Sequence, residues 1–297
     1  MHERAAKPWS RREVLIALTA LACSRPRAKE DEPVTTKPAA KLLPTVFVSH
    51  GAPSLLLEDA PARTFLAGLG AEFPKPRAIL CVSAHWTTRA PRVDVSTSPE
   101  TIHDFGGFPD ELYARRYPAP GSPELARDVV KRLASAGVSA ETSERGLDHG
   151  AWVPLELAYP AADVPVVQLA LQPHLGAAHH VALGRALEGL RKEGVLVLGS
   201  GGATHNLGAL GAGDRPPAWA RAFDDWLVEC VERGDERELT LYRSLAPEAA
   251  RNHPTEEHLL PLHVAFGAAG AGARGRAMHR SFTWSSLSMT AFRFDGA

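Results

Sequence analysis

The chain has 297 residues, of which 44% are hydrophobic and 23% charged, and its formal net charge at pH 7 is −1. This composition is typical of a globular protein with an ample hydrophobic core. The near-neutral charge, without a dense run of lysine and arginine in the body of the chain, argues against a nucleic-acid partner. No apolar stretch approaches the length needed to span a bilayer.

Residues 1–23 have the pattern of an export signal. The pair Arg11 and Arg12 precedes an apolar run from Val14 to Ala22, which ends at Cys23. This order is that of a secretory signal, and the arginine pair is typical of the twin-arginine type. The last four residues of this segment, Ala-Leu-Ala-Cys, resemble a lipoprotein box. We therefore expect a periplasmic protein or a lipoprotein anchored at Cys23, and a cytoplasmic one if the segment is only an uncleaved extension.

Residues 24–43 are rich in proline, lysine, glutamate and alanine and contain little to bury. Such a segment is expected to be a disordered linker. The remainder, residues 44–297, is predicted to be one catalytic domain.

Within residues 44–297, strand-like and helical patterns alternate. In chain order we expect a strand at 45–49, a helix at 60–69, strands at 77–83 and 92–97, a helix at 123–137, a strand at 164–171, a helix at 177–189, a strand at 194–199, a helix at 217–233 and a closing strand or hairpin at 281–294. This order predicts an α/β fold, a single three-layer domain around a mostly parallel central sheet.

Three histidines follow expected strands of this sheet. They are His50, His85 and His205, and small neighbouring residues would allow a ligand to approach them closely. A fourth, His258, is expected in the first turn of a helix capped by Thr255. Because ligands gather at the carboxyl ends of parallel strands and imidazole commonly binds zinc and iron, the pattern predicts a mononuclear metal site. A single strand-end histidine is more often a hydrogen-bonded structural residue, so the prediction depends on all four.

Two more histidines lie in segments that could border this site. Residues 101–122, which contain His103, form a long irregular stretch with two phenylalanines around a glycine pair, and we expect a wall or lid over the site. His149 follows Asp148 between glycines, ahead of a helical pattern. It could act as a general acid or base, or donate a hydrogen bond to a substrate. The alternative is a structural Asp–His pair.

Taken together, these segments resemble the class III extradiol ring-cleavage dioxygenases, in particular the bacterial branch similar to DOPA 4,5-dioxygenase. The resemblance runs from about residue 44 to the C-terminus. It rests on the segments SHGAPSLLLED, VSAHWTT, TIHDFGGFPDELYARRYPAPGSPELA, GLDHGAWVPL, VPVVQLAL, THNLG, NHPTEEHLLPL and SLSM. The N-terminal extension departs from the pattern of that branch.

The resemblance implies a mononuclear non-haem metal whose ligands fall on His50, His85 and His258. His205 falls on the acid/base position and could also complete the coordination shell as a fourth ligand. His103 and His149 fall on segments that line the pocket, where His149 would take part in catalysis and His103 would bind substrate. Three aromatic residues, Trp86, Phe105 and Phe108, would enclose the substrate ring.

The implied reaction is extradiol opening of a catechol-type ring by O2. The resemblance implies Fe(II) as the cofactor, with zinc possible in its place, and a small aromatic diol and O2 as the partners. Two alternatives stay open from the residues themselves. One is a zinc-dependent hydrolase-like enzyme on the same scaffold, and the other is a protein that binds a metal or small molecule without turnover.

Overall fold

The computed structural model describes residues 42–213 and 215–296. The predicted export signal, including Cys23, and nearly all of the predicted linker lie outside the described residues. None of the described helices is both long and apolar enough to cross a membrane.

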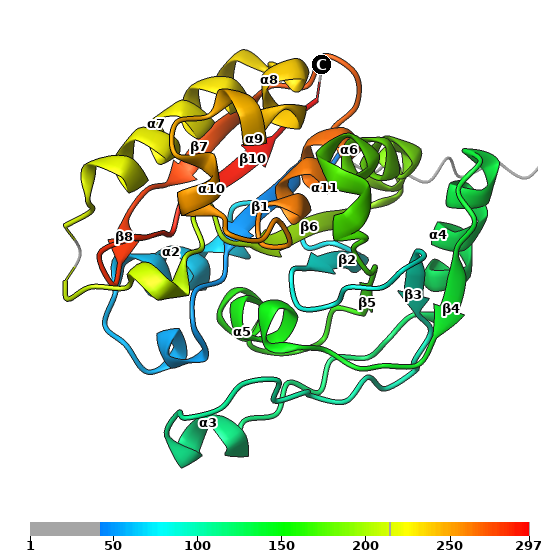
Figure 1. The fold of residues 1–297 in the computed structure, drawn as a ribbon. Coiled ribbons are helices and arrows are strands. Elements are labelled where there is room, and N and C mark those ends of the chain that lie inside the picture. The colour runs from blue at the N-terminus through cyan, green and yellow to red at the C-terminus, as the bar shows by residue number, and fades with distance from the viewer. Residues whose placement is uncertain (1–41, 214, 297) are drawn as a thin grey trace, which may run out of the picture. The chain divides into compact units, whose positions relative to one another are not determined.

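A six-stranded sheet in the order β5-β2-β6-β1-β10-β7 forms the centre of the molecule (Figure 1). Its four parallel strands are β1 (Thr45–Ser49), β2 (Ala78–Ser83), β5 (Val166–Gln168) and β6 (Val195–Gly201). The antiparallel strands β10 (Ala291–Phe294) and β7 (Gly275–His279) extend one edge. The prediction of a mostly parallel sheet is confirmed.

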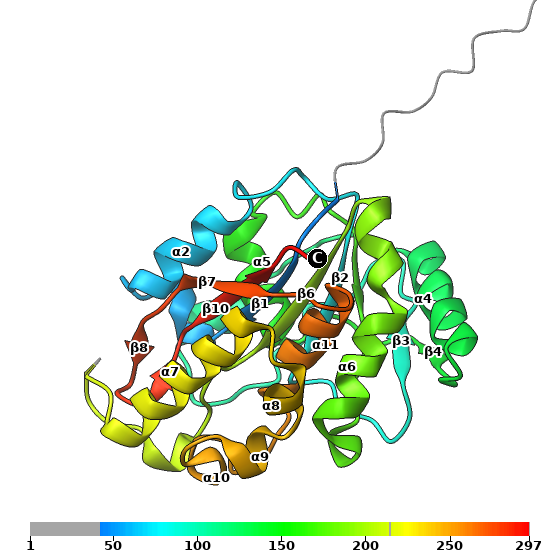
Figure 2. The ribbon, with the colours of Figure 1, turned by 90° about the horizontal axis from the view of Figure 1, so that it is seen from above.

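Helices cover both faces of the sheet and complete three layers (Figures 1 and 2). One face carries α2 (Pro61–Leu69) and α5 (His149–Ala158), and the other carries α4 (Pro123–Ser135), α6 (Gly176–Ala186), α7 (Ala218–Arg233) and α11 (Leu260–Ala268). Along β2, Ile79 and Cys81 pack into the first core, whereas Leu80 and Val82 pack into the second. This alternation explains why the strand reads as a continuous apolar run, because it is buried on both faces.

The remaining elements are short. They are the helices α3 (Asp110–Ala114), α8 (Glu236–Thr240), α9 (Tyr242–Leu245) and α10 (Ala249–Asn252), the 3-10 turns η1 (Pro53–Leu56), η2 (Pro173–Leu175), η3 (Glu188–Glu193) and η4 (Leu207–Ala209), and the small strands β3 (Arg92–Asp94), β4 (Glu141–Ser143), β8 (Phe282–Thr283) and β9 (Leu287–Ser288). The strand expected at 92–97 is thus shorter and pairs with β4 outside the central sheet. The closing segment is divided into three strands.

The helix expected to contain His258 begins later than the sequence indicated. Helix α11 starts at Leu260, so His258 lies in the turn before it. The Thr255 hydroxyl donates a hydrogen bond to the Glu257 carboxylate, 2.8 Å away, rather than capping the helix. The expected first turn was therefore wrong, and the side chain of His258 is positioned by a turn.

His180, a fully buried histidine on α6, makes the stability of the protein depend on pH. Its Nδ1 lies 2.7 Å from the Gly176 carbonyl oxygen and its Nε2 accepts the Gln172 backbone N–H at 3.1 Å. Because the carbonyl can only accept and the amide can only donate, the ring is neutral with its proton on Nδ1. Burial lowers the pKa of His180 from 6.5 to about 3.

We expect the free energy of unfolding to fall as the pH falls from about 6.5 towards 3, because only the unfolded state takes up this proton. This one group accounts for up to about 1.4 kcal/mol per pH unit. Urea unfolding of the metal-free protein at pH 7.5 and pH 5 measures the difference. His180→Gln should be less stable at pH 7.5 and lose less stability on acidification. An undiminished loss in that variant would contradict the assignment.

Candidate metal centre

Three adjacent parallel strands bring histidines to one edge of the sheet. His85, His205 and His50 follow β2, β6 and β1, which are neighbours in the sheet. The ring centroids of His50 and His85 lie 5.0 Å apart, and those rings lie 5.6 Å and 5.0 Å from the ring of His258. The His205 ring stacks on that of His258 at 3.3 Å. The structure thus brings together all four histidines that the sequence singled out.

The glycines at the end of β6 hold the turn that carries His258 against the sheet. A Cβ on Gly201 would lie 2.0 Å from the His258 carbonyl oxygen, and one on Gly199 would lie 2.3 Å from the Pro261 carbonyl oxygen. The Gly202 N–H donates to the same His258 carbonyl at 2.9 Å. Gly199 and Gly201 thus leave room for the backbone of this turn, and Gly201 and Gly202 also line the cavity, as expected of small residues beside His205.

His258 has a polar atom without a partner. Its side chain is 7% exposed, and its Nδ1 lies 3.1 Å from a Glu257 carboxylate oxygen. Its Nε2 is buried and makes no hydrogen bond within the described part of the chain. A buried polar atom left unpaired is costly, and most such atoms in native proteins have a partner. Coordination of a metal ion by Nε2 would provide one.

His50 is oriented by a serine from the neighbouring strand. The Ser200 hydroxyl donates its only proton to the Gly150 carbonyl oxygen, and its oxygen lies 3.0 Å from His50 Nδ1. His50 Nδ1 must therefore carry the proton and donate to Ser200, which leaves a lone pair on Nε2. That Nε2 lies 3.1 Å from His85 Nε2. Two nitrogens bound at about 2.1 Å to one ion lie about 3 Å apart, so this pair fits a shared metal.

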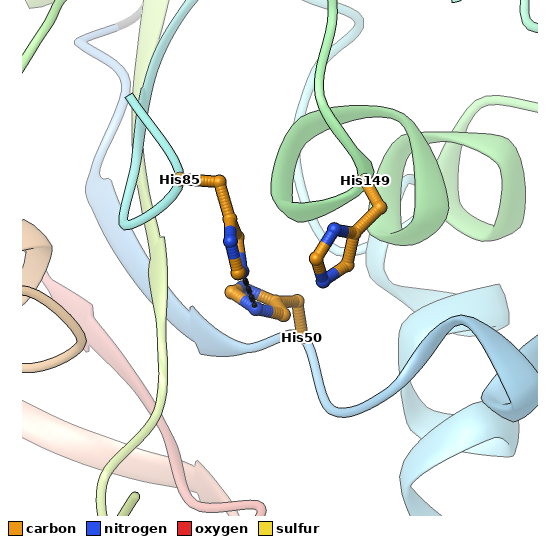
Figure 3. Close-up of side chains that lie close together, drawn as sticks. All are labelled: His50, His85 and His149. Atoms are coloured by element: carbon orange, nitrogen blue, oxygen red, sulfur yellow. Dashed lines mark hydrogen bonds between the residues drawn. The ribbon is translucent and has the colours of Figure 1, made fainter. Parts of the chain in front are cut away.

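One carboxylate orients two further imidazoles. Asp104 Oδ1 lies 2.9 Å from His149 Nδ1, and its other oxygen lies 3.6 Å from His85 Nδ1. Burial opposes ionisation of Asp104, but hydrogen bonds and charge from His149 outweigh it and lower the pKa of the carboxyl to about 2. Because an ionised carboxylate only accepts, Nδ1 of His149 carries a proton and donates it to Asp104. Figure 3 shows His50, His85 and His149 facing one another from three separate segments.

His149 is the first residue of α5 rather than a loop residue. Asp148, the residue that caps this helix, accepts the Ala151 N–H through its side chain. The next residue, Gly150, packs directly against the site: a Cβ there would lie 2.3 Å from Ser83 Oγ and 2.9 Å from a carbon of the His85 ring. Only glycine lets α5 begin this close to the histidines.

Burial keeps four histidines of the site, His50, His85, His205 and His258, neutral. Removal from water is the largest cause that lowers the pKa of His50, His258 and His205, and the neighbouring imidazoles lower those of His50 and His258 further. The pKa of His85 falls to about 4 for the same main reason, burial. A neutral imidazole is the form that binds a metal ion, so the cluster is ready to coordinate one at neutral pH.

Two separate groups of side chains could hold a metal ion. One consists of His50, His85 and His149, and the other of His205, Glu257 and His258. In each group the candidate ligand atoms lie within 4.8 Å of one another. The donor chemistry fits a divalent transition metal such as zinc or iron, for which imidazole and carboxylate are ordinary ligands.

The histidines border a cavity of about 420 Å³, within the range usual for small-molecule sites. Phe105 and Phe108 of the predicted aromatic wall line it. His103 and Trp86 are not among its lining residues in the described part of the chain. The ring of His103 lies 5.7 Å from that of Phe105, so it supports the aromatic wall from behind. Trp86 is buried, with the Arg145 guanidinium 5.2 Å from its ring.

Three residues of the site, Asp104, Ser200 and Gly150, were not predicted from the sequence. The only signal for Asp104 was an acidic residue beside His103 in the aromatic segment. Ser200 lies in a Gly-Ser-Gly-Gly run, which lacks the Gly-x-Ser-x-Gly spacing of a nucleophile turn. Its hydroxyl is in fact occupied by Gly150 and His50.

Replacing Asp104 by asparagine should weaken the site without removing a ligand atom. The amide keeps the size of the side chain but loses the charge that holds the His149 and His85 tautomers. Loss of such an outer partner lowers metal affinity or activity about 10–100-fold. Competitive chelator titration measures the affinity, with Asp110→Asn, on exposed α3, as the control. Unchanged affinity and unchanged turnover together would show that Asp104 does not orient the imidazoles.

This chain is similar to known aromatic ring-opening dioxygenases. Residues 45–294 match the family described as the catalytic LigB subunit of aromatic ring-opening dioxygenase. A Beta vulgaris protein named 4,5-DOPA dioxygenase extradiol is 45% identical over 256 residues, covering 84% of this chain and 96% of the relative. An Escherichia coli K12 protein of the same name is 41% identical, covering 76% of this chain and 85% of the relative.

A solved structure shows the same fold. The crystal structure of an uncharacterized protein from Escherichia coli K12 superposes with a TM-score of 0.70 at 32% sequence identity. The superposition covers 84% of this chain and 99% of that one. The α/β architecture of this chain is therefore shared with that structure.

Proposed function

The chain belongs to the LigB family of extradiol aromatic ring-opening dioxygenases, and from this premise we propose that it opens a catechol ring with O2 at a single Fe(II) ion held by histidines. The observation that carries the proposal is the buried, unpartnered Nε2 of His258 among neutral imidazoles at the floor of an aromatic-walled cavity. Because the chain belongs to this family of dioxygenases, we propose neither a zinc-dependent hydrolase nor a protein that binds a metal or small molecule without turnover.

We assign the metal ligands to His50, His85 and His258. Their three ring separations, 5.0, 5.0 and 5.6 Å, are nearly equal, as expected for rings arranged around one point. All three have Nδ1 directed to an outer partner, Ser200, Asp104 or Glu257, which leaves Nε2 for the metal. Histidine ligands are usually oriented in this way. His149, held firmly by Asp104, is left beside the metal with Nε2 available to the substrate.

Bound Fe(II) would supply a Lewis acid that lowers the pKa of a catechol hydroxyl and an electron source for O2. The protein's own residues do the remaining work. His205, neutral because burial lowers its pKa, accepts the proton of a substrate hydroxyl and returns it later in the reaction. Phe105 and Phe108 pack against the ring and exclude water. If His205 binds the metal instead, His149 is the remaining base in the cavity.

Loading the metal-free protein with different ions tests this function. Zinc has no redox chemistry, so only the Fe(II)-loaded protein should consume O2 and form a yellow ring-opened product from a catechol. The zinc-loaded protein is the matched control, prepared under the same anaerobic conditions. If the iron-loaded protein consumes no O2 with any catechol of a broad panel, the proposed function is wrong.

We further propose that residues 1–23 direct export. The twin-arginine pattern would carry the domain across the membrane after it has folded and acquired its metal. Expression of the full chain in a bacterial host, followed by fractionation, tests this. The variant with both Arg11 and Arg12 changed to lysine should stay in the cytoplasm, and Cys23→Ser should release the protein from the membrane fraction if Cys23 is lipidated. Cytoplasmic location of the unaltered chain would refute export.

A further inference from the structure

The walls of the cavity indicate which catechols it accepts. Among the described residues that line it, Asp104 is the only Asp, Glu, Lys or Arg, and its carboxylate is bound to His149. Building on the function proposed above, we propose that this enzyme prefers catechols with an uncharged, apolar substituent over catechols whose side chain carries a carboxylate, such as DOPA.

An aromatic corner forms one part of the wall. The rings of Phe105 and Phe108 meet edge to face at 5.5 Å, and Phe105 also packs 6.2 Å from the buried ring of Trp152. Trp152 is itself fixed, because its Nε1 donates to the Ile102 carbonyl oxygen at 2.9 Å. This corner therefore offers a rigid apolar surface without a hydrogen-bond donor from its side chains.

Two leucines that remain exposed in the folded protein form another part of the cavity wall. Leu207 is 60% exposed and Leu210 is 39% exposed, yet both line the cavity. Large apolar side chains left in water lose the stabilisation that burial would give them. An apolar substituent of a bound substrate would cover them, which gives these two positions a reason to be leucine.

Trp284 lines the cavity together with the two leucines and lies in a turn that hydrogen bonds hold in place. Its φ is +48°, a conformation that bulky residues rarely adopt. Hydrogen bonds to the leucine-bearing loop hold the turn: the Trp284 carbonyl accepts the Gly211 N–H at 3.0 Å, and the Ser286 hydroxyl donates to the Ala209 carbonyl oxygen at 2.9 Å. Strained backbone maintained in this way is characteristic of ligand sites. Here it places an indole in the cavity wall.

Arg145 and Arg116, which lie beside His85 and His103, do not line the cavity. Arg145 donates to Asp148 at 2.7 Å and to the His85 carbonyl oxygen at 3.1 Å. Arg116, beside His103, donates to the Tyr113 carbonyl oxygen at 2.7 Å. A substrate carboxylate in the cavity would thus lose hydration without gaining a cation, and it would face the charge of Asp104. Burying a charged group without a partner of opposite charge costs free energy, and binding sites commonly reject charged ligands in this way.

A pair of substrates that differ only at the end of the side chain tests the preference. In 4-propylcatechol a methyl group stands where 3-(3,4-dihydroxyphenyl)propanoate has its carboxylate. We expect kcat/KM of the iron-loaded enzyme to be at least about 10-fold higher for 4-propylcatechol, and also higher than for DOPA. Anaerobic calorimetry of the same compounds gives their binding without turnover and should show the same order. Equal or better binding and cleavage of the carboxylates would overturn the preference.

A charge introduced at the mouth provides the second test. Leu210→Arg should narrow the ratio of the two kcat/KM values about 10-fold by pairing with the carboxylate. Leu210→Gln is the control, since it removes the same apolar contact without adding charge and should leave the carboxylate substrate no better used. If no catechol is cleaved at all, the proposed function fails, whereas a ratio that favours carboxylates with cleavage intact refutes only the preference.

Discussion

Replacing His258 by alanine is expected to lower metal affinity about 10²–10³-fold and to remove ring-opening activity at ordinary metal concentrations. Structural zinc sites bind with about 10–16 kcal/mol over four ligands, so one ligand corresponds to about 3–4 kcal/mol. The change also removes the buried Nε2 that has no partner in the described chain. The metal-free variant should therefore fold at least as well as its parent, even though it binds metal poorly.

Metal content by elemental analysis and affinity by chelator competition measure the effect. His263→Ala is the control: His263 is equally buried in α11, but it hydrogen-bonds to the carbonyl oxygens of Leu259 and Leu239 and is outside the cluster. That variant should lose stability and keep its metal affinity. His149→Ala distinguishes the two possible ligand groups. If His149→Ala loses the metal while His258→Ala retains it, the ligand assignment made above is wrong.

Replacing His205 by alanine is expected to lower kcat about 10²–10⁴-fold while metal content stays unchanged. That range is the usual contribution of a general acid or base. Burial lowers the pKa of His205, while the nearby charge of Glu257 partly opposes this, so the imidazole is neutral and able to accept a proton at pH 7. Anaerobic binding of a catechol should change little, which separates loss of proton transfer from loss of binding.

Added imidazole provides a readout that a purely structural role of His205 would not give. Its side chain is only partly buried and lines the cavity, so a small base can enter the space that alanine leaves. Rescue should raise kcat, and the acidic limb of the pH profile should move up towards the pKa of free imidazole. The limb moves up because burial lowers the pKa of His205 below that of free imidazole. The unaltered enzyme therefore keeps a neutral base, and its activity, to lower pH than the rescued variant. Loss of metal from His205→Ala would instead identify a fourth ligand.

Much of the site could be predicted from the sequence. Apolar β-prone runs alternating with helices predict a parallel sheet, and in such a sheet all strands end at the same edge. His50, His85 and His205 each follow one of these runs, so their convergence depends only on chain direction. The aromatic segment around Phe105 and Phe108 was predicted as a wall because it is too long and too apolar for an ordinary loop.

The orientation of the imidazoles could not be predicted in this way. Ser200, which directs His50, is 150 residues away from it in the chain, and Asp104, which directs His149, is 45 residues away. No local pattern connects such pairs, because they meet only when strands and loops have packed. The same holds for His258, whose backbone lies against the sheet because Gly201 leaves room for it.

The α/β sheet and the edge at which the histidines meet are thus predictable from the sequence, because they follow from local periodicity and chain direction, whereas the family was indicated by the resemblance of the quoted motifs. Which nitrogen of each imidazole is free to bind a ligand depends on the folded structure, because tautomers are set by partners distant in the chain, such as Asp104 and Ser200. The folded structure also places Leu207, Leu210 and Trp284 in the cavity wall, whereas Trp86 and His103 are not among the described residues that line it. Loop packing sets those positions, and loop packing is where the specificity for a substrate lies.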